Sequence, residues 1–519
     1  MSNTINWGKI YEKTAWGIGV VTNTISWGKI YADLVGALPS FALDFLNISN
    51  DFTFTRASFA TRVNEFGLIE TVTDLGSELV VNGSFDTDSD WIKQEGWTIS
   101  GGTANFLDGG IGNRNIYQSM LTVGKTYELT FTILNYVSGG IRNVSQGGFI
   151  PTYSANGTYT ETFVATNSSL FLKADINSEL SIDNVSVKEV LEDDVPRIDY
   201  TNGEAEFLLE PQSTNLLPYS EDFSQWNAIS NPTVTLNQAI SPDGTNNATL
   251  LEFDQTVTTS RIEVSIPSGG GGDWVFSIWA KSVSGNDVSF GMEIGSAGTL
   301  EQERVATSEW KRFYIVGTTT SSVNLYPQIE AWTTNNESIY IWGGQLEALP
   351  YATSYIPTNG SAVTRSAESC VGATPTINSE EGVLYAEISA LADDGTNRVI
   401  QLSNGTNSNR IFISYWTLSN EIRFIVQVGG VTQSFDSTTA YDILEFNKIA
   451  FKYKENDFAL WINGTEVITD TSGITFPIGT LTQLDFDSNG SAPFYGKTKD
   501  LRIYDKALTD DELITITSI

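Results

Sequence analysis

The sequence has no histidine and only one cysteine, Cys370, among its 519 residues. A single cysteine excludes a framework of intrachain disulfides. Without histidine, the chain lacks the commonest general base and the commonest ligand of transition metals. Catalysis by a Ser-His-Asp or Cys-His arrangement is therefore excluded, and a catalytic zinc site is not expected.

Basic residues are also scarce, because 28 lysines and arginines stand against 62 aspartates and glutamates, which gives a formal net charge of −34. Such a chain repels the phosphates of nucleic acids and the anionic surfaces of membranes, so we expect neither as a partner. No apolar run approaches the roughly 18 residues that a membrane-spanning helix needs. The opening residues lack the basic and apolar regions of a signal peptide, which predicts synthesis in a cytoplasm.

The abundant residues are those of β-proteins. Tryptophan (13), tyrosine (20) and phenylalanine (27) are frequent, and glycine reaches 45. Together with many Thr, Ser and Asn residues, this composition fits half-buried strands joined by tight turns. We therefore predict an all-β protein of several tandem antiparallel sandwich or jelly-roll domains. The one convincing helix start is in ALTDDELITI, where Thr509 can cap a first turn that carries acidic residues.

One predicted domain interrupts another. An alternating phrase over Asp51–Val72 stops abruptly, and a related phrase resumes at Val195–Trp226 after a complete set of alternating strands. A domain inserted into a surface loop explains this order. We predict the following limits: an N-terminal repeat over 1–40, a split frame over 41–75 plus 191–214, an inserted jelly roll over 76–190, a second jelly roll with its linker over 215–370, and a final sandwich over 371–519.

The N-terminal repeat consists of NTINWGKIY at Asn3–Tyr11 and NTISWGKIY at Asn23–Tyr31. Each copy is too short to bury its own apolar side chains, so it needs a neighbour to cover them. Either the repeat docks onto a partner, or the two copies pair with each other as a small hairpin. The docking interpretation assigns an anchoring role to Trp7, Ile10, Tyr11, Trp27, Ile30 and Tyr31.

The C-terminal phrase FYGKTKDLRIYDKALTDDELITI (Phe494–Ile516) resembles the last strand and helix of concanavalin-A-like, laminin-G type sandwiches. The matching residues are Gly496, Asp500, Arg502, Ile503, Tyr504, Ala507, Leu508, Thr509 and Glu512. The resemblance implies a domain that binds glycans or proteins more often than it cleaves anything.

The predicted insertion resembles carbohydrate-binding jelly rolls, through its opening ELVVNGSFDTDSDW and its closing SIDNVSVKEV. In that family a structural Ca²⁺ often lies beside these two strands. The resemblance implies Asp86 and Asp183 as calcium ligands, with backbone carbonyls completing the shell. The alternative is that Asp183 and its neighbour only shape the last turn.

The frame resembles a phrase that is common in bacteriophage virion proteins, especially tail fibres. It carries FTRASFATRV, PRIDY and FLLEPQSTNLLPYSEDF, and the following jelly roll ends in WGGQLE and YATSYIPT. The resemblance implies a virion location, in which the N-terminal repeat contacts other virion proteins. It also implies a homotrimer, which would multiply weak affinities for sugars. The phrase in those phage proteins is not usually interrupted, so the predicted inserted domain is a departure from it.

Sugar binding needs exposed aromatic rings with a polar rim. The candidates are Trp91, Trp97, Trp226, Trp332 and Trp416, although sandwiches bury tryptophan more often than they expose it. Trp342, inside a strand phrase, is assigned to the core. Hydrolysis would need two carboxylates across a sugar cleft. The chain has 62 acidic residues, so almost any two could be proposed as such a pair and the choice carries no weight. We therefore predict that the chain is not an enzyme.

The main hypothesis is a phage virion structural protein, a head or tail fibre, whose modules contact host-surface polysaccharide. One alternative is a structural capsid or tail decoration that binds no sugar. A second is a bacterial surface protein that binds or degrades polysaccharide. Apart from a possible structural Ca²⁺, we predict no cofactor.

Overall fold

The computed structural model describes residues 39–45, 48–110, 112–148, 150–296, 302–333 and 338–519. They belong to two compact units: an inserted unit of residues 73–195, and a main unit formed by the residues before and after it. The described ranges consist of antiparallel sheets with two short α-helices, α2 (Ile48–Asp51) and α3 (Asp510–Thr517). The prediction of an all-β protein is therefore confirmed. Neither helix in these ranges is long and apolar enough to cross a membrane.

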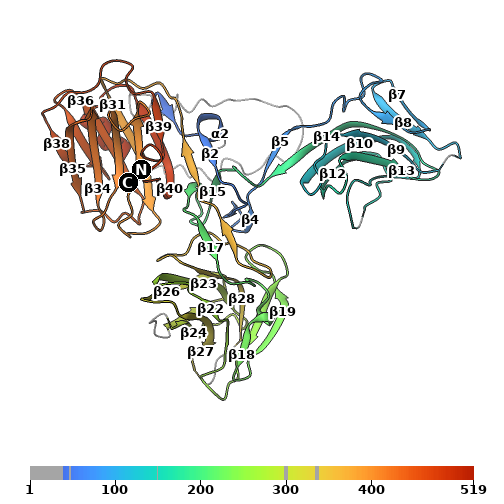
Figure 1. Ribbon diagram of the computed structural model, residues 1–519, viewed down its shortest axis with the longest axis horizontal. Helices are drawn as coiled ribbons and strands as arrows, with labels where there is room; N and C mark the ends of the chain where they lie inside the picture. Colours follow the sequence, from blue (N-terminus) through green and yellow to red (C-terminus); the bar gives the residue numbers. More distant parts are fainter. Residues whose placement is uncertain (1–38, 46–47, 111, 149, 297–301, 334–337) are drawn as a thin grey trace, which may run out of the picture. The chain divides into compact units, whose positions relative to one another are not determined.

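The inserted unit is a sandwich of two sheets around one core (Figure 1). Strand β10 shows why, since Leu129, Phe131 and Ile133 alternate with polar residues and all three are buried. The larger sheet has the order β12-β10-β14-β8-β7, with β5 paired to β14. Its strands are β5 (Asp74–Glu78), β7 (Trp97–Ser100), β8 (Thr103–Leu107), β10 (Thr126–Ser138), β12 (Gly157–Val164) and β14 (Glu179–Leu191). The smaller sheet has the order β11-β13-β9-β6, with β6 (Ile92–Lys93), β9 (Arg114–Ser119), β11 (Ile141–Asn143) and β13 (Ser169–Ala174).

The main unit contains a jelly roll and a C-terminal sandwich. One jelly-roll sheet has the order β18-β21-β27-β24-β25, with β22 paired to β27. Its strands are β18 (Asn227–Ile229), β21 (Arg261–Glu263), β22 (Ile266–Pro267), β24 (Val288–Gly295), β25 (Gln302–Ala306) and β27 (Asn324–Ala331). The other has the order β19-β20-β28-β23-β26, with β19 (Thr233–Ala239), β20 (Ala248–Glu252), β23 (Gly272–Ser282), β26 (Lys311–Thr319) and β28 (Ile339–Glu347). A short 3₁₀ helix, η2 (Phe223–Gln225), precedes β18.

The C-terminal sandwich packs a five-stranded sheet on an eight-stranded one. The five-stranded sheet has the order β35-β34-β33-β32-β39, with β32 (Arg398–Ser403), β33 (Arg410–Tyr415), β34 (Ile422–Val428), β35 (Val431–Thr438) and β39 (Gln483–Asp485). The larger sheet has the order β15-β16-β40-β31-β36-β37-β38, with β1 also paired to β40. Its strands are β1 (Phe41–Ala42), β15 (Arg197–Asp199), β16 (Glu206–Leu209), β31 (Glu381–Ala390), β36 (Asn447–Lys454), β37 (Phe458–Ile462), β38 (Thr465–Asp470) and β40 (Gly496–Tyr504).

The predicted frame, 41–75 plus 191–214, is not a separate layer. Strands β1, β15 and β16 extend the eight-stranded sheet beside β40. The remaining frame strands form small pairs between the C-terminal sandwich and the jelly roll. These pairs are β2 (Thr53–Thr55) with β30 (Ser369–Val371), β3 (Thr61–Val63) with β4 (Ile69–Thr71), and β17 (Ser213–Asn215) with β29 (Val363–Arg365). The frame thus ties the two sandwiches of the main unit together.

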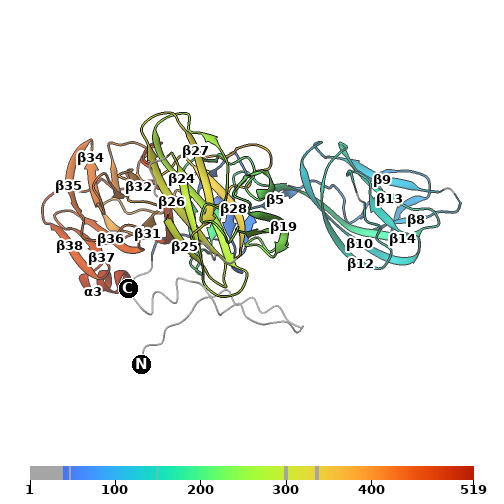
Figure 2. The ribbon, with the colours of Figure 1, turned by 90° about the horizontal axis from the view of Figure 1, so that it is seen from below.

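The predicted helix start at Thr509 is confirmed. The Thr509 hydroxyl accepts from the Glu512 backbone N–H, and the Glu512 carboxylate accepts from the Thr509 backbone N–H, which is a capping box. The helix that follows, α3, packs against β36 and β37 (Figure 2). Its buried side chains Leu513 and Ile516 cover the outer face of the eight-stranded sheet.

Candidate functional site

Three of the five predicted sugar-binding tryptophans are buried. Trp91, Trp97 and Trp226 expose 6%, 4% and 6% of their surface. The indole N–H of each donates to a backbone carbonyl oxygen, at 3.0, 3.2 and 3.1 Å respectively. Their rings fill the cores of the inserted unit and of the jelly roll. Because a buried ring presents no face to a sugar, the prediction of a platform is wrong for these three.

The other two candidates, Trp332 and Trp416, are half-buried. Trp332 follows β27 and lines neither of the two cavities described below. Trp416 follows β33 and lines one of them. Trp342 is 1% exposed, so its assignment to the core is confirmed.

The cavity at Trp416, called the sandwich cavity here, has a volume of about 570 Å³. It lies on the face of the five-stranded sheet that points away from the core. In β33, Ile411 and Ile413 point into the core, so Phe412 between them points into the cavity. The remaining lining comes mostly from the loops that flank the sheet: Thr396, Asn397, Val399, Asn407, Arg410, Trp416, Ser488, Ser491, Ala492 and Pro493.

Two aromatic rings form the apolar part of the sandwich cavity. The rings of Phe412 and Trp416 are nearly parallel, with an interplanar angle of 11° and centroids 6.3 Å apart. The guanidinium of Arg423 covers one face of Trp416 at 4.4 Å from the ring centroid. Its Nη2 also pairs with Glu421 at 2.9 Å. Arg423 therefore holds Trp416 in place by covering one face of its ring, and other parts of the ring line the sandwich cavity.

The only charged side chain among the described residues that line the sandwich cavity is Arg410. Its Nε donates to the amide oxygen of Gln427 at 2.7 Å, and its Nη1 donates to Asn407 Oδ1 at 3.0 Å and Ser488 Oγ at 2.8 Å. The guanidinium carbon lies 5.1 Å from the centroid of the Phe412 ring. Burial lowers the pKa of Arg410 from its usual value, which still leaves the group charged. Four neutral contacts therefore fix a cation at the cavity wall.

The polar rim of the sandwich cavity has unused capacity for hydrogen bonds. The amide oxygen of Asn397 is buried and has no hydrogen-bond partner in the described residues. A buried acceptor without a partner is costly, and a ligand that donates to it removes that cost. Asn407, Ser488 and Ser491 add amide and hydroxyl groups around the same opening. The arrangement of flat rings and neutral polar groups suits the alternating C–H and O–H surfaces of a sugar.

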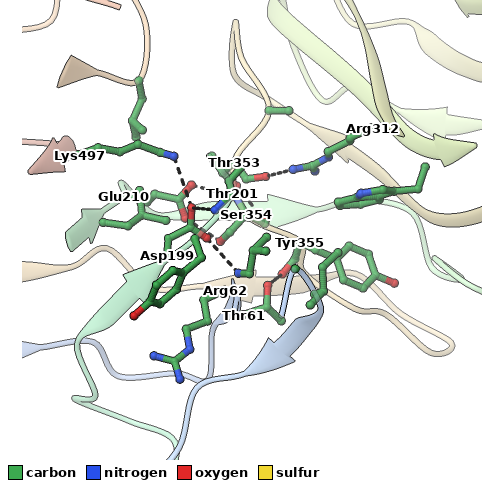
Figure 3. Close-up of a pocket in the computed structure, with 18 of the residues that line it drawn as sticks. Thr61, Arg62, Asp199, Thr201, Glu210, Arg312, Thr353, Ser354, Tyr355 and Lys497 are labelled. Atoms are coloured by element: carbon green, nitrogen blue, oxygen red, sulfur yellow. Dashed lines mark hydrogen bonds and ion pairs between the residues drawn. The ribbon is translucent and has the colours of Figure 1, made fainter. Parts of the chain in front are cut away.

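A second cavity, of about 500 Å³, lies where the frame, the jelly roll and the C-terminal sandwich meet (Figure 3). We call it the junction cavity. Thr61 and Tyr355 lie on one side of it, where the Thr61 hydroxyl donates to the Tyr355 carbonyl oxygen at 2.5 Å. Arg312 donates to the Thr353 carbonyl oxygen at 2.6 Å and covers a face of Trp279 at 4.3 Å. Arg312 thus covers one face of Trp279, as Arg423 covers one face of Trp416.

A network of buried charges lies beside the junction cavity. Glu368 pairs with Arg56 at 2.9 Å and with Arg197 at 2.7 Å. Glu210 pairs with Arg197 at 2.8 Å and with Arg365 at 2.6 Å. All five side chains are at most 4% exposed. Burial alone would raise the pKa of Glu210, but the guanidinium groups of Arg365 and Arg197 lower it to about 2.

This network was not predicted from the sequence, although three of its members belong to the frame phrases. Arg56 is in FTRAS, Arg197 is in PRIDY and Glu210 ends FLLE. The available signal was Glu210 directly after the apolar residues of β16, because a charged residue in such a place is seldom buried without a partner. In the structure, the buried ion pairs of these residues connect segments of the main unit that are far apart in the sequence.

Of the two predicted calcium ligands, Asp183 lies on β14 and Asp86 lies in the loop between β5 and β6. The Val185 backbone N–H donates to the Gly83 carbonyl oxygen at 2.9 Å, next to Asp86 and Asp183 in the sequence. Asp86 accepts from Ser84 Oγ at 2.7 Å, and Asp183 accepts from the Asn184 backbone N–H at 2.6 Å. In the described ranges, no three acidic, histidine or cysteine side chains gather as a metal cluster. Calcium binding here stays a prediction, as does the alternative of turn shaping.

The predicted anchoring residues Trp7, Ile10, Tyr11, Trp27, Ile30 and Tyr31 lie outside the described residues. The predicted contact of the N-terminal repeat with other virion proteins therefore stays a prediction.

Comparison with known proteins identifies the C-terminal sandwich. Residues 384–514 match the family described as the concanavalin A-like lectin/glucanases superfamily. The resemblance of the C-terminal phrase to concanavalin-A-like, laminin-G type domains is thereby confirmed. Among curated proteins, none matches this chain.

Solved structures with similar parts come from several carbohydrate-active proteins. The CBM40 of the Ruminococcus gnavus IT-sialidase, bound to α2,3-sialyllactose, is 19% identical, with a TM-score of 0.24; the match covers 27% of this chain and 83% of that one. Domain 4 of a Geobacillus stearothermophilus GH43 arabinanase, in complex with arabinotriose, is 16% identical with a TM-score of 0.23, over 29% and 77% of the two chains. The tandem CBM22 domains of Paenibacillus barcinonensis Xyn10C are 12% identical with a TM-score of 0.21, over 53% and 98%.

Proposed function

We propose that this chain is a phage virion structural protein, a head or tail fibre, whose C-terminal sandwich binds host-surface polysaccharide. The virion part of the proposal is supported by the frame phrases and by the jelly-roll phrases WGGQLE and YATSYIPT. The polysaccharide part is supported by one observation above all: the sandwich cavity combines the half-buried ring of Trp416 with a rim of amides and hydroxyls.

The chemistry of the sandwich cavity fits a sugar ring. The C–H faces of a pyranose pack on aromatic rings, here that of Trp416, because Phe412 is only 3% exposed. Its hydroxyl groups exchange hydrogen bonds with short polar side chains, here Asn397, Asn407 and Ser491. The C-terminal sandwich also belongs to a superfamily whose name includes lectins, which agrees with recognition of a carbohydrate.

We further propose that the chain binds and does not cleave. Glycoside hydrolysis uses a pair of carboxylates that flank the bond to be broken. Of the described residues that line the sandwich cavity, none is acidic. Incubation of the full chain with a bound polysaccharide should therefore leave its length unchanged, and release of reducing ends would contradict this part of the proposal.

Binding by the full-length chain to a glycan array and to intact bacterial cells tests the main proposal. We expect saturable binding to one class of polysaccharide. Trp416→Ala should weaken it at least tenfold, because stacking on an aromatic ring is lost. The matched control is Trp332→Ala, which removes a half-buried indole outside both cavities and should leave binding unchanged. Absence of binding by the folded chain would favour a purely structural decoration of the capsid or tail.

The virion assignment has its own test. The N-terminal repeat is proposed to attach the chain to other virion proteins, and symmetric assembly as a homotrimer is proposed to raise avidity. Deletion of residues 1–40 should abolish incorporation into phage particles and leave glycan binding intact. Presence of the protein on bacterial surfaces in the absence of particles would instead favour a bacterial surface protein. A structural Ca²⁺ at Asp86 and Asp183 belongs to the same proposal.

A further inference from the structure

The sandwich cavity has a positive charge that no acidic side chain balances. Arg410 forms its hydrogen bonds with Gln427, Asn407 and Ser488, which are all neutral acceptors. The described residues that line this cavity include no aspartate or glutamate, in a chain with 62 of them. Arg304 and Arg312 also form their described hydrogen bonds with neutral acceptors only, so what distinguishes Arg410 is its position in the wall of the sandwich cavity.

Arginines and lysines elsewhere in the main unit show the contrast. Arg423, behind Trp416, pairs with Glu421 at 2.9 Å. At the junction cavity, Arg62 pairs with Glu70 at 2.9 Å and Lys497 pairs with Glu206 at 2.6 Å. Asp485 and Asp487 are not among the residues that line the sandwich cavity. Burial raises the pKa of both, and the Asp487 carboxylate accepts from the Gly490 backbone N–H at 2.9 Å.

The hydrogen bonds of Arg410 leave one guanidinium nitrogen, Nη2, for a ligand. The guanidinium Nε and Nη1 are occupied, and no hydrogen bond of Nη2 to another described residue is present. The three hydrogen bonds and the contact with the Phe412 ring hold the plane of the group, so little conformational freedom is lost when an anion binds. A hydrogen bond between two charged groups is about twice as strong as a neutral one.

We propose that the sandwich cavity selects an acidic saccharide, with the carboxylate of a uronic-acid residue on Nη2 of Arg410 and the sugar ring against Trp416. This inference rests on the proposed polysaccharide binding and adds the charge class of the sugar. The net charge of −34 repels a polyanion at long range, but at physiological ionic strength that repulsion is screened beyond about 8 Å. Inside the cavity the local charge is positive because of Arg410, and a bound sugar interacts with this local charge.

The test uses the full-length chain and matched pairs of probes. Oligosaccharides of polygalacturonate, polymannuronate and hyaluronate are each compared with their carboxyl-reduced forms, and a sulfated galactan without carboxylates is added. We expect at least one acidic form to bind about tenfold or more tightly than its reduced partner. Arg410→Gln should remove this preference, whereas Arg410→Lys should keep part of it. Because Arg410→Lys retains the charge, comparison of the two variants separates loss of charge from loss of fold.

The matched control is Arg304→Gln in the jelly roll, since Arg304 also forms its described hydrogen bonds with neutral acceptors only. It should leave the preference unchanged. Equal binding of acidic and reduced forms, still lost in Trp416→Ala, would overturn this inference and leave the proposed function standing. Binding of no saccharide on the probes or on the glycan array would overturn both. Preference for the sulfated galactan over every uronate would overturn the assignment to a carboxylate.

Discussion

Arg197 and Glu368, 171 positions apart in the chain, form a buried ion pair in which Nε of the arginine lies 2.7 Å from Oε1 of the glutamate. Neither side chain is exposed to solvent. Arg197 belongs to the frame beside the C-terminal sandwich, and Glu368 follows the jelly roll. Because charges are strongly attracted where water is excluded, the pair joins segments that the sequence separates widely.

Removing one partner of this pair should destabilise the main unit strongly. Glu368→Gln leaves Arg56 and Arg197 buried without their shared carboxylate, and the loss of one partner from a buried ion pair costs about 3–5 kcal/mol. We expect the transition of the main unit to move to lower urea concentration. The matched control is Glu204→Gln, which breaks the exposed pair of Glu204 with Lys499 and should cost no more than about 1 kcal/mol. Equal effects of the two substitutions would contradict the role of the network.

The stability of the main unit should also depend on pH through Glu210. Its pKa is about 2 in the folded chain, below its ordinary 4.5, because Arg365 and Arg197 outweigh the effect of burial. A lowered folded-state pKa stabilises the fold above pH 4.5, and this contribution is lost as the pH falls from 4.5 toward 2. The urea midpoint should therefore fall between pH 4.5 and pH 3, and Glu210→Gln should flatten this decrease. Glu303→Gln, at an exposed position, should not.

Gly83 should tolerate no side chain. A Cβ there would lie 2.0 Å from the Val185 carbonyl oxygen, so the turn that holds Gly83 would have to move away from β14. Gly83→Ala should lower the free energy of unfolding of the inserted unit by about 1–3 kcal/mol, as other overpacked substitutions do. At Gly76, in the same unit, the nearest atom to an added Cβ is 3.4 Å away, so Gly76→Ala is the control. Thermal unfolding monitored by circular dichroism measures both.

Calcium is expected to raise the unfolding temperature of the inserted unit. An ion that binds only the folded state at a hundred times its Kd stabilises it by about 2.7 kcal/mol. The proposed site at Asp86 and Asp183 predicts an increase in Tm with Ca²⁺ that a chelator reverses and that Asp86→Asn abolishes. Magnesium at the same concentration should have a smaller effect, because it demands stricter octahedral geometry. An unchanged Tm would leave Asp183 with the turn-shaping role.

Of the five tryptophans that the sequence suggests as a sugar platform, only Trp416 lines a cavity in the described residues, and sugar binding there stays a prediction. Trp97 and Trp416 look alike in the sequence, since each lies in a phrase of alternating residues. Trp97 points into the core of the inserted unit, where its N–H meets a backbone carbonyl. Trp416 directly follows the last residue of β33 and lies on the outer face. Which face a residue occupies depends on strand register, and register is decided by pairing partners far away in the chain.

Composition and local pattern determined the all-β class, the existence of an inserted domain and the capped helix α3, because turns, alternation and the Thr509 capping box act within a few residues. The tertiary structure alone decided where the charges and cavities are. Arg56, Arg197, Glu210 and Glu368 meet only because the frame strands pair with segments more than a hundred positions distant. Arg410 faces neutral acceptors because a loop near the C-terminus places Ser488 beside it. Such contacts depend on which segments the fold brings together, and no local pattern encodes that.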